Sequence, residues 1–160
     1  MADQDLKALV AQGLQALRAG GEAARGATAE IEGDARDPGL RDALQAGTRT
    51  AERWTQRIDR AIAEAGPAEN TGNPILEAHV RVSREIRARA PDAQTRDLGI
   101  VAAGQLALHY WIAAFGTLRT YAAALGLSGA ERDMQACLDE AKEADQQHSA
   151  VAERLLAAPG

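Results

Sequence analysis

The chain has 160 residues, of which 46% are hydrophobic and only 3% aromatic, and its formal net charge is −5. This length predicts a single domain over residues 1–160 with a core built mostly from aliphatic side chains. The acidic balance argues against nucleic acid or an anionic membrane as a partner. The single cysteine, Cys137, excludes an internal disulfide. Together with an N-terminus that lacks an export pattern, it predicts a cytoplasmic location.

The first segment, residues 3–31, has the pattern of an amphipathic helix. Its larger apolar residues lie three or four positions apart, at Leu6, Val10, Leu14 and Leu17. We expect the adjacent Gly20 and Gly21 to weaken or bend this helix, because each glycine costs up to about 1 kcal/mol relative to alanine. The run GDARDPG at 33–39 then predicts a loop.

The second predicted helix, residues 40–65, has the most regular apolar pattern of the chain, typical of the seam of a bundle helix. The seam consists of Leu40, Leu44, Gly47, Ala51, Trp54, Ile58, Ala61 or Ile62, and Ala65. A loop over 66–74 follows, and Pro74 suits the first turn of a third, shorter helix. The face expected to be buried on that helix carries Ile75, His79, Val82 and Ile86.

The longest stretch without a fixed charge is residues 98–118, LGIVAAGQLALHYWIAAFGTL. Its length fits a membrane span, but polar residues and glycines interrupt it and its flanks lack a one-sided excess of basic charge. The apolar stripes of the other helices also need a common partner. We therefore expect a bundle helix surrounded by other helices, with Leu108, Trp111 and Phe115 on one buried face.

Capping residues mark where the last two helices begin. Asp92 or Thr95, after Pro91, can cap the central helix, and Ser128 with Glu131 predicts a capping box for the last one. The stripe predicted for the last helix is Ala130, Met134, Cys137 or Leu138, Ala141, Asp145, His148, Val151 or Ala152, and Leu155. No strand pattern occurs. The sequence predicts an all-α fold, a ferritin-like antiparallel four-helix bundle with an additional short helix in the crossover between bundle helices 2 and 3.

Three segments resemble one known family. The run RDLGIVAAGQLALHYWIAAFGTL and the later LDEAKEAD resemble the third and fourth helices of the YciE/YciF family of ferritin-like proteins. DPGLRDAL resembles the start of that family's second helix. The resemblance covers most of the chain from about residue 20 onward. It implies a bacterial stress-associated protein, a homodimer and a di-iron-type site.

Most metal-ligand positions implied by this resemblance are substituted. The family's Gln-x-x-Glu-His-Tyr motif has Leu108 in place of its glutamate, and Gly47 stands where the second helix would carry histidine. Thr50 and Ala51 replace a Glu-Thr pair, and Ala141 replaces one of two adjacent glutamates. The remaining candidate metal ligands are Glu22, His109, Glu140, Asp145 and His148. We therefore expect no cofactor and no complete di-iron centre, with one iron or another divalent ion as the alternative.

Polar residues remain on the expected inner faces of the last two helices. In an antiparallel hairpin that turns near Leu127, His109 lies opposite Asp145 and His148, with Gln105 one turn away. We expect these four side chains to form a buried polar quartet. In one interpretation they satisfy one another and fix the helix register. In the alternative they bind a single metal ion or a small ligand.

Other candidate residues have simpler interpretations. His79 is expected at the edge of the core, and Cys137 within it, where a thiol is unreactive. Arg81, Arg84 and Arg87 recur every three residues. They predict a solvated face or, alternatively, a site for an anion or an acidic partner.

The sequence contains no phosphate-binding loop, nucleophile elbow or paired-carboxylate signature, which argues against catalysis. Three functions stay open. The chain can be a non-catalytic, dimeric bundle of the stress-associated type, a metalloprotein with one reduced metal site, or a binder of small molecules that uses space in the bundle core.

Overall fold

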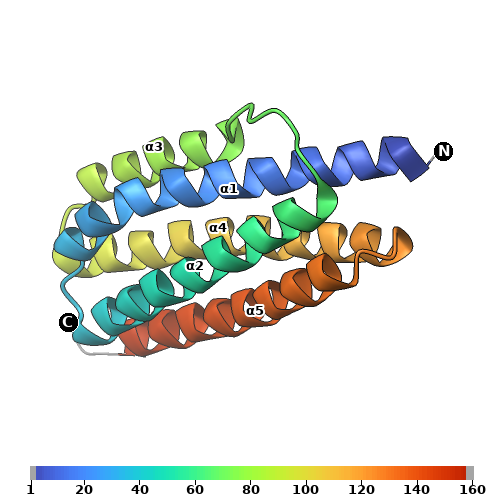
Figure 1. The fold of residues 1–160 in the computed structure, drawn as a ribbon. Coiled ribbons are helices and arrows are strands. Elements are labelled where there is room, and N and C mark those ends of the chain that lie inside the picture. The colour runs from blue at the N-terminus through green and yellow to red at the C-terminus, as the bar shows by residue number, and fades with distance from the viewer. Residues whose placement is uncertain (1–2, 158–160) are drawn as a thin grey trace.

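The computed structural model describes residues 3–157, and all regular structure in that range is helical (Figure 1). Helix α1 spans Asp3–Asp34, α2 Pro38–Ala65, α3 Pro74–Arg89, α4 Ala93–Ala124 and α5 Ser128–Ala157. The ends of the predicted domain, at residues 1 and 160, lie outside the described residues. The predicted all-α bundle, with its short helix in the crossover, is confirmed.

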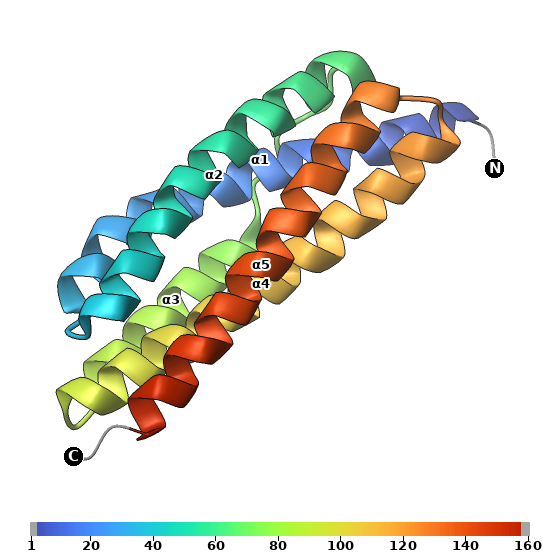
Figure 2. The same cartoon turned by 90° about the horizontal axis from the view of Figure 1, so that it is seen from below.

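Two long hairpins, α1–α2 and α4–α5, form the bundle (Figures 1 and 2). Helix α5 packs along both α4 and α2, and α1 packs along α2 and α4. The crossover helix α3 lies beside α1 and α4 and does not extend to the α4–α5 turn. Four long helices therefore enclose the centre of the molecule, and α3 covers part of one side.

The turn between α1 and α2 is held by the carboxylate of Asp97 on α4. That carboxylate accepts hydrogen bonds from the backbone N–H groups of Arg36 at 2.9 Å and Asp37 at 2.7 Å. Asp37 caps α2 by accepting from the N–H of Leu40, and it pairs with Arg154 of α5 at 2.6 Å. Asp97 is only 2% exposed, so these bonds satisfy a buried charge and tie the turn to two other helices.

The start of α3 is seated against α1 through Asn73. The side-chain amide of Asn73 donates to the carbonyl of Ala16 at 2.9 Å and to the hydroxyl of Tyr110 at 2.7 Å, and its oxygen accepts from the N–H of Leu76. A Cβ on Gly20 would lie 2.6 Å from the Leu76 side chain. Glycine thus permits this close approach, and α1 continues through Gly20 as one helix.

The face that α3 buries differs from the prediction. Leu76, Ser83 and Arg87 are buried, whereas Ile75 and Val82 are exposed. Arg87 pairs with carboxylates of α1, and this pairing turns a polar face of α3 toward the bundle. The predicted buried face is therefore wrong at Ile75 and Val82, whereas His79 and Ile86 are partly buried.

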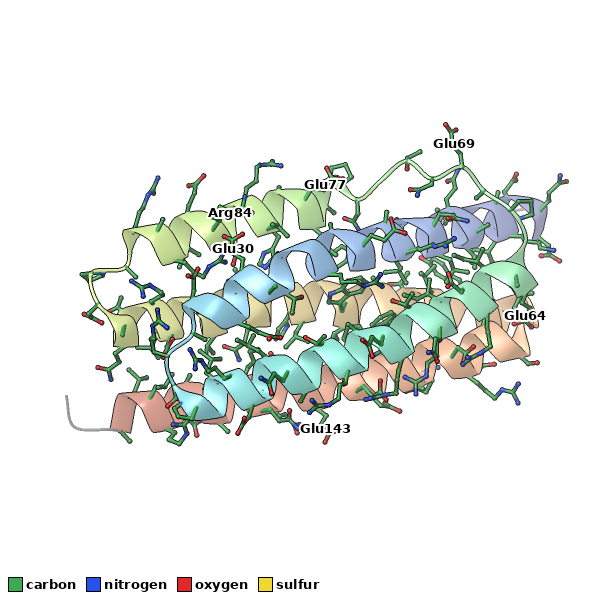
Figure 3. All side chains as sticks on the ribbon, turned by 60° about the vertical axis from the view of Figure 1, so that its left-hand side comes forward. Glu30, Glu64, Glu69, Glu77, Arg84 and Glu143 are labelled. Carbon is green, nitrogen blue, oxygen red and sulfur yellow. The ribbon has the colours of Figure 1, made fainter. Side chains whose placement is uncertain are left out.

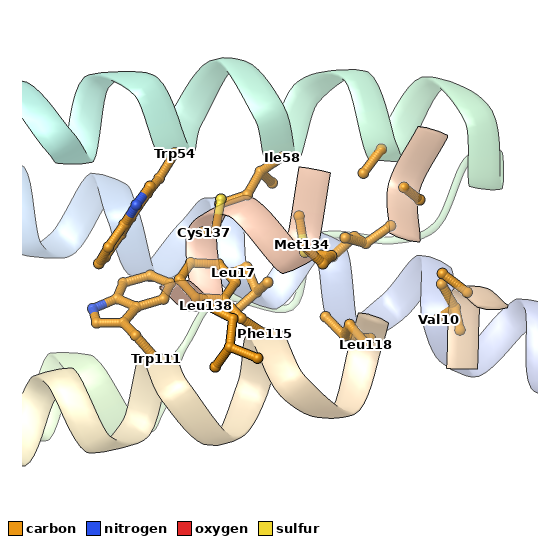
Figure 4. Close-up of a cluster of buried hydrophobic side chains, with 14 of the residues drawn as sticks. Val10, Leu17, Trp54, Ile58, Trp111, Phe115, Leu118, Met134, Cys137 and Leu138 are labelled. Atoms are coloured by element: carbon orange, nitrogen blue, oxygen red, sulfur yellow. The ribbon is translucent and has the colours of Figure 1, made fainter. Parts of the chain in front are cut away.

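The core consists of two clusters of buried side chains. The larger one, near the α4–α5 turn, joins α1, α2, α4 and α5 (Figure 4). The smaller one, at the opposite end, consists of Ala35, Leu40, Ile100, Val101 and Leu155. In the larger cluster the Trp54 ring lies 5.0 Å from that of Phe115 and 5.7 Å from that of Trp111. Leu108, Trp111 and Phe115 are all buried, so the predicted shared face is confirmed.

Helix α4 is not covered on every side, contrary to the prediction. Its outer stripe, Ala102, Leu106, His109 and Ala113, is exposed. Within the chain α4 packs against α1, α3 and α5 and contacts Trp54 of α2 with its buried face, and this outer stripe remains exposed. By length and composition alone α4 could cross a membrane, with a mean hydropathy of 1.5 over a window of which 33% is buried.

The beginning of α5 is capped from another helix. The predicted capping box of Ser128 and Glu131 does not form. Glu64 of α2 accepts hydrogen bonds from the backbone N–H groups of Gly129 and Ala130 instead, at 3.2 and 2.5 Å. A carboxylate at a helix N-terminus satisfies free N–H groups and opposes the positive end of the helix dipole. This contact fixes the end of α2 beside the α4–α5 turn.

We predict that Trp111→Ala lowers the free energy of unfolding by about 3–5 kcal/mol, because it removes a buried ring that packs against three other aromatic rings. Urea unfolding followed by circular dichroism measures the change. Ile75→Ala is the control, since Ile75 is 64% exposed, and should change stability by less than about 0.5 kcal/mol. A loss below about 1 kcal/mol for Trp111→Ala would contradict the packing described here.

Candidate functional site

A cavity of about 390 Å³ lies between the two core clusters. Its wall is formed mainly by small and apolar side chains from all five helices, among them Ala27, Gly47, Ala51, Ala103, Leu108 and Trp111. Gly47 and Ala51, which the sequence placed in the buried seam of α2, are exposed. They lie where the wall of the cavity meets solvent, so the predicted seam is wrong at these two positions.

The cavity is lined by several of the positions at which the resemblance to YciE/YciF proteins implies metal ligands. Leu108, Gly47, Thr50 and Ala51 all line it, and so does Glu140. Ala141, the other substituted position, is fully buried in the larger core cluster. Space at the centre of this bundle thus occurs where small or apolar side chains stand in place of donors.

Glu140 is the carboxylate that remains at the cavity, and α2 supplies three donors to it. Arg57 donates at 2.7 Å, the indole N–H of Trp54 at 2.9 Å and Arg53 at 3.2 Å. Burial would raise the pKa of Glu140, but the hydrogen bonds from Arg57 and Trp54 outweigh it and lower the pKa below its usual value. The charge of Glu140 is therefore balanced within the protein.

The predicted quartet does not form one group in the structure. His109 Nε2 lies 3.3 Å from Asp145, and Gln105 donates to Asp145 at 3.5 Å and to Ser149 at 2.8 Å. The hairpin register deduced from the sequence is therefore correct for His109 and Asp145. However, the His109 side chain is 66% exposed, so this group lies on the surface and not in the core.

His148 points into the bundle, away from the other three members of the quartet. Its ring is 9% exposed, it lines the cavity, and it contacts α4 at Gly104, where a Cβ would lie 2.9 Å from the ring. Gly104 and His109 are five residues apart, which places them about 140° apart around α4. His109 pairs with Asp145 on the surface whereas His148 is buried against Gly104, so the expectation of one buried quartet is wrong.

The remaining predicted ligands do not converge on the cavity. Glu22 is exposed on α1, where it lies 3.9 Å from Arg18. Within residues 3–157, no group of three or more His, Cys, Asp or Glu side chains is placed to hold a metal ion. The donors within the cavity are the balanced carboxylate of Glu140 and the imidazoles of His79 and His148, while Glu52 and Glu143 are exposed at its edge. This set does not fit a di-iron centre, which needs several carboxylates that converge on the metal.

His79 and Cys137 have the surroundings expected from the sequence. His79 lines the cavity at the edge of the core, and burial lowers the pKa of its imidazole. Cys137 is fully buried, and burial raises the pKa of its thiol to about 12. A thiol that stays protonated is a poor nucleophile and a poor metal ligand.

The arginine ladder of α3 makes contacts within the chain, which neither interpretation of the sequence anticipated. Arg84 and Arg87 both pair with Glu30 of α1, at 3.0 and 2.6 Å, and Arg87 also pairs with Asp34 at 2.8 Å (Figure 3). Arg87 is 4% exposed, so it is not part of a solvated face. Arg81 remains exposed. These ion pairs fasten α3 to α1 beside the cavity.

Sequence reasoning missed the donors that surround Glu140. Arg53 and Arg57 are four residues apart on α2 and flank Trp54, so they emerge on the side that meets α5. That spacing was visible in the sequence, but the pairing of α2 with α5 was not. Asp97, whose carboxylate holds the α1–α2 turn, was missed for the same reason.

The helical arrangement defines a ferritin-like bundle with an additional helix in its crossover. A family model described as "Domain of unknown function (DUF892)" matches residues 5–158, so the chain belongs to this family. Its fold is similar to that of the E. coli stress protein YciF, with a TM-score of 0.88 and 22% identity over 97% of each chain. The resemblance predicted from the sequence is confirmed.

A second solved structure, YcfI from Rhodopseudomonas palustris, has a TM-score of 0.85 and is 23% identical, over 93% of this chain and 94% of that one. At these identities both likenesses establish the fold alone. No curated protein sequence matches the chain significantly.

We predict that the stability contributed by Glu30 disappears in acid. Hydrogen bonds from Arg84 lower the pKa of Glu30 from 4.5 to about 2 in the folded protein. Its ion pairs therefore stabilise the fold fully above pH 4.5 and are lost as the pH falls to about 2. The difference in free energy of unfolding between wild type and Glu30→Gln should be largest near about pH 6 and shrink steadily toward about pH 2.5.

The matched control is Glu69→Gln, in the exposed loop before α3 (Figure 3). It should differ little from wild type at either pH in the same urea titration. A Glu30→Gln difference that is constant with pH would contradict the ion pairs.

Proposed function

We propose that this chain is a non-catalytic ferritin-like protein that lacks a complete di-iron centre and binds a small organic molecule in its central cavity. The cavity carries this proposal, because it lies where the resemblance implies metal ligands and most of its wall is apolar. Its volume of about 390 Å³ falls within the range of ligand pockets, roughly 300–1,000 Å³.

The state of Glu140 supports the absence of a di-iron centre. A metal ion would have to displace Arg57, Arg53 and Trp54 from this carboxylate, and Leu108 offers no donor on the facing helix. The alternative of a single metal site has less support, since His148 faces the cavity whereas His109 and Asp145 pair on the surface.

The cellular setting is proposed by analogy. YciF is described as a stress protein, and YcfI has been given a provisional structural role. We propose the same stress-associated setting for this chain. A cytoplasmic location and the absence of a nucleic-acid partner stay predictions from its composition.

We also propose that the exposed stripe of α4 pairs with a second copy of the chain. An apolar helix must be surrounded on all sides, and this chain leaves the stripe of Ala102, Leu106, His109 and Ala113 uncovered. Small side chains at two of the four positions permit close approach of two helices. A two-fold axis beside Leu106, which is 64% exposed, would cover the stripe of both copies at once.

The iron prediction is that wild-type protein neither accelerates oxidation of ferrous iron under air nor retains two irons per chain, because the anionic ligands that two ions need are missing. Absorbance kinetics and metal analysis after aerobic loading measure both. Leu108→Glu combined with Arg57→Gln adds one carboxylate and removes the shortest of the three hydrogen bonds to Glu140, and should raise the retained iron. Two tightly held irons in the wild type would contradict the proposal.

The ligand prediction is that organic molecules extracted from purified wild-type protein include one that is absent from Gly47→Leu. Gly47 lines the cavity, and a Cβ there would meet no atom within 4 Å, so leucine can occupy the space without displacing the backbone. Gly26→Leu is the matched control, because Gly26 also has open space but does not line the cavity. Mass spectrometry of the extracts decides, and identical extracts from all three proteins would contradict cavity binding.

The dimer prediction concerns Leu106→Glu, which places a charge in the proposed interface. Light scattering coupled to size-exclusion chromatography should give a dimer for wild type and a monomer for this variant. Ile75→Glu is the control and should remain dimeric, since Ile75 is equally exposed, at 64%, but lies on α3. A monomeric wild type, or one that partitions into detergent, would refute pairing through α4.

A further inference from the structure

Two polar groups on buried side chains reach the cavity and make no hydrogen bond within the part of the chain that the structure describes. The first is Nε2 of His148. The other ring nitrogen, Nδ1, lies 2.9 Å from the carbonyl oxygen of Ala144. A carbonyl only accepts, so Nδ1 carries the hydrogen and Nε2 of the neutral ring presents a lone pair. His148 is 9% exposed, which leaves the cavity as the place from which a donor can reach it.

The second group is the indole N–H of Trp111. Trp111 is 6% exposed and lines the cavity, and no acceptor for its N–H occurs among residues 3–157. The nitrogen end of the ring points away from Phe115 and Leu138 in Figure 4. The corresponding N–H of Trp54 donates to Glu140, so the two tryptophans differ in this respect. An indole N–H that reaches a cavity is a donor aimed at a ligand acceptor.

The other polar side chains of the inner wall have partners, and His79 is hydrogen-bonded to the backbone of Ala103. The charged and polar residues Arg25, Glu52, Glu143 and Gln147 also line the cavity, but they are exposed where it opens to solvent. Thr28 donates to the carbonyl of Ala24, and Ser83 accepts from Arg87. Glu140 has its three donors from α2, as described above. The inner wall therefore offers a ligand one donor, one acceptor and otherwise apolar surface. A ligand with a net charge would find no free partner for it inside.

The volume of the cavity and the distance between the two polar groups limit the size of the ligand. An apolar cavity of about 150 Å³ holds benzene, so a cavity of about 390 Å³ admits two or three rings. Gly104, which contacts His148, and Trp111 are seven residues apart and thus lie on one face of α4, separated by about 10 Å along the helix. Because helical side chains lean toward the N-terminus, the indole N–H is somewhat closer to His148 than this.

We propose that the cavity takes a neutral, planar, aromatic molecule of two or three rings with an oxygen group at each end. A hydroxyl at one end donates to Nε2 of His148, and an oxygen at the other accepts from the indole N–H of Trp111. The rings lie against the indoles of Trp54 and Trp111, which favour aromatic over aliphatic partners. This proposal rests on the cavity function proposed above and names its ligand class.

The test uses three probes of known structure and isothermal titration calorimetry. Naphthalene-2,6-diol has a hydroxyl at each end, 2,6-dimethoxynaphthalene keeps both oxygens as acceptors but has no donor, and 1-decanol has a hydroxyl on an aliphatic chain. Wild type should bind the diol about three- to tenfold more tightly than the dimethoxy compound, the effect of one hydrogen bond. It should bind decanol more weakly than either aromatic probe.

Two variants test which residue binds each end of the ligand. Trp111→Phe keeps a ring but removes the N–H, so it should weaken both aromatic probes by about three- to tenfold. His148→Phe removes only the acceptor, so it should weaken the diol and abolish its advantage over the dimethoxy compound. Circular dichroism and thermal unfolding check that each variant is folded. If one variant does not fold, the ratio of the two affinities in wild type still decides.

The outcomes separate this proposal from the cavity function. Equal binding of the diol and the dimethoxy compound, or tighter binding of decanol, would overturn the ligand class. If Gly47→Leu nevertheless abolished that binding while Gly26→Leu did not, the cavity would remain a binding site. Failure of all three probes to bind wild type would overturn the ligand class, and identical extracts from wild type, Gly47→Leu and Gly26→Leu would overturn the cavity function itself.

Discussion

The charge of Glu140 is the constraint on which the centre of this bundle depends. A partly buried carboxylate must be paired, and here α2 supplies Arg57, Arg53 and the indole N–H of Trp54. These contacts hold α2 against α5 and fix the orientation of the Trp54 ring. That ring packs on Trp111 and Phe115, so it closes the larger core cluster on the side that faces the cavity. In a di-iron protein the same charge would face metal.

The cavity exists because several residues that line it together with Glu140, on α2 and α4, have small side chains. Gly47 and Ala51 on α2 and Ala103 and Gly104 on α4 are too small to fill the space between the two core clusters. The flanks of this space are secured by separate polar contacts. Asp97 holds the α1–α2 turn and Arg87 holds α3 against α1. These contacts keep the helices in place beside the cavity, so the fold does not depend on side chains that fill it. An open centre is therefore compatible with a well-packed bundle at both ends.

The sequence predicted helices and register better than it predicted which faces are buried. The periodicity and caps located all five helices, and the α4–α5 hairpin register brought His109 opposite Asp145 as expected. The prediction of buried faces was wrong where a polar contact between helices outweighed the burial of apolar side chains. On α3, the ion pair of Arg87 with Glu30 buries a polar face in place of part of the apolar stripe. The arginines that bind Glu140 were not predicted, because the sequence pattern does not show that α2 packs against α5. The cavity was foreseen only as a possibility, because its volume depends on how four helices pack.

We propose that a paired charge and a cavity occupy the place where the resemblance to YciE/YciF proteins implies a metal site. Anomalous diffraction at the iron absorption edge, from crystals grown with ferrous salt, tests this claim most directly. We expect no pair of anomalous peaks at the cavity, with Glu140 still hydrogen-bonded to Arg57 and Trp54. Two peaks beside Leu108, with Glu140 released from Arg57 and coordinating them, would contradict it.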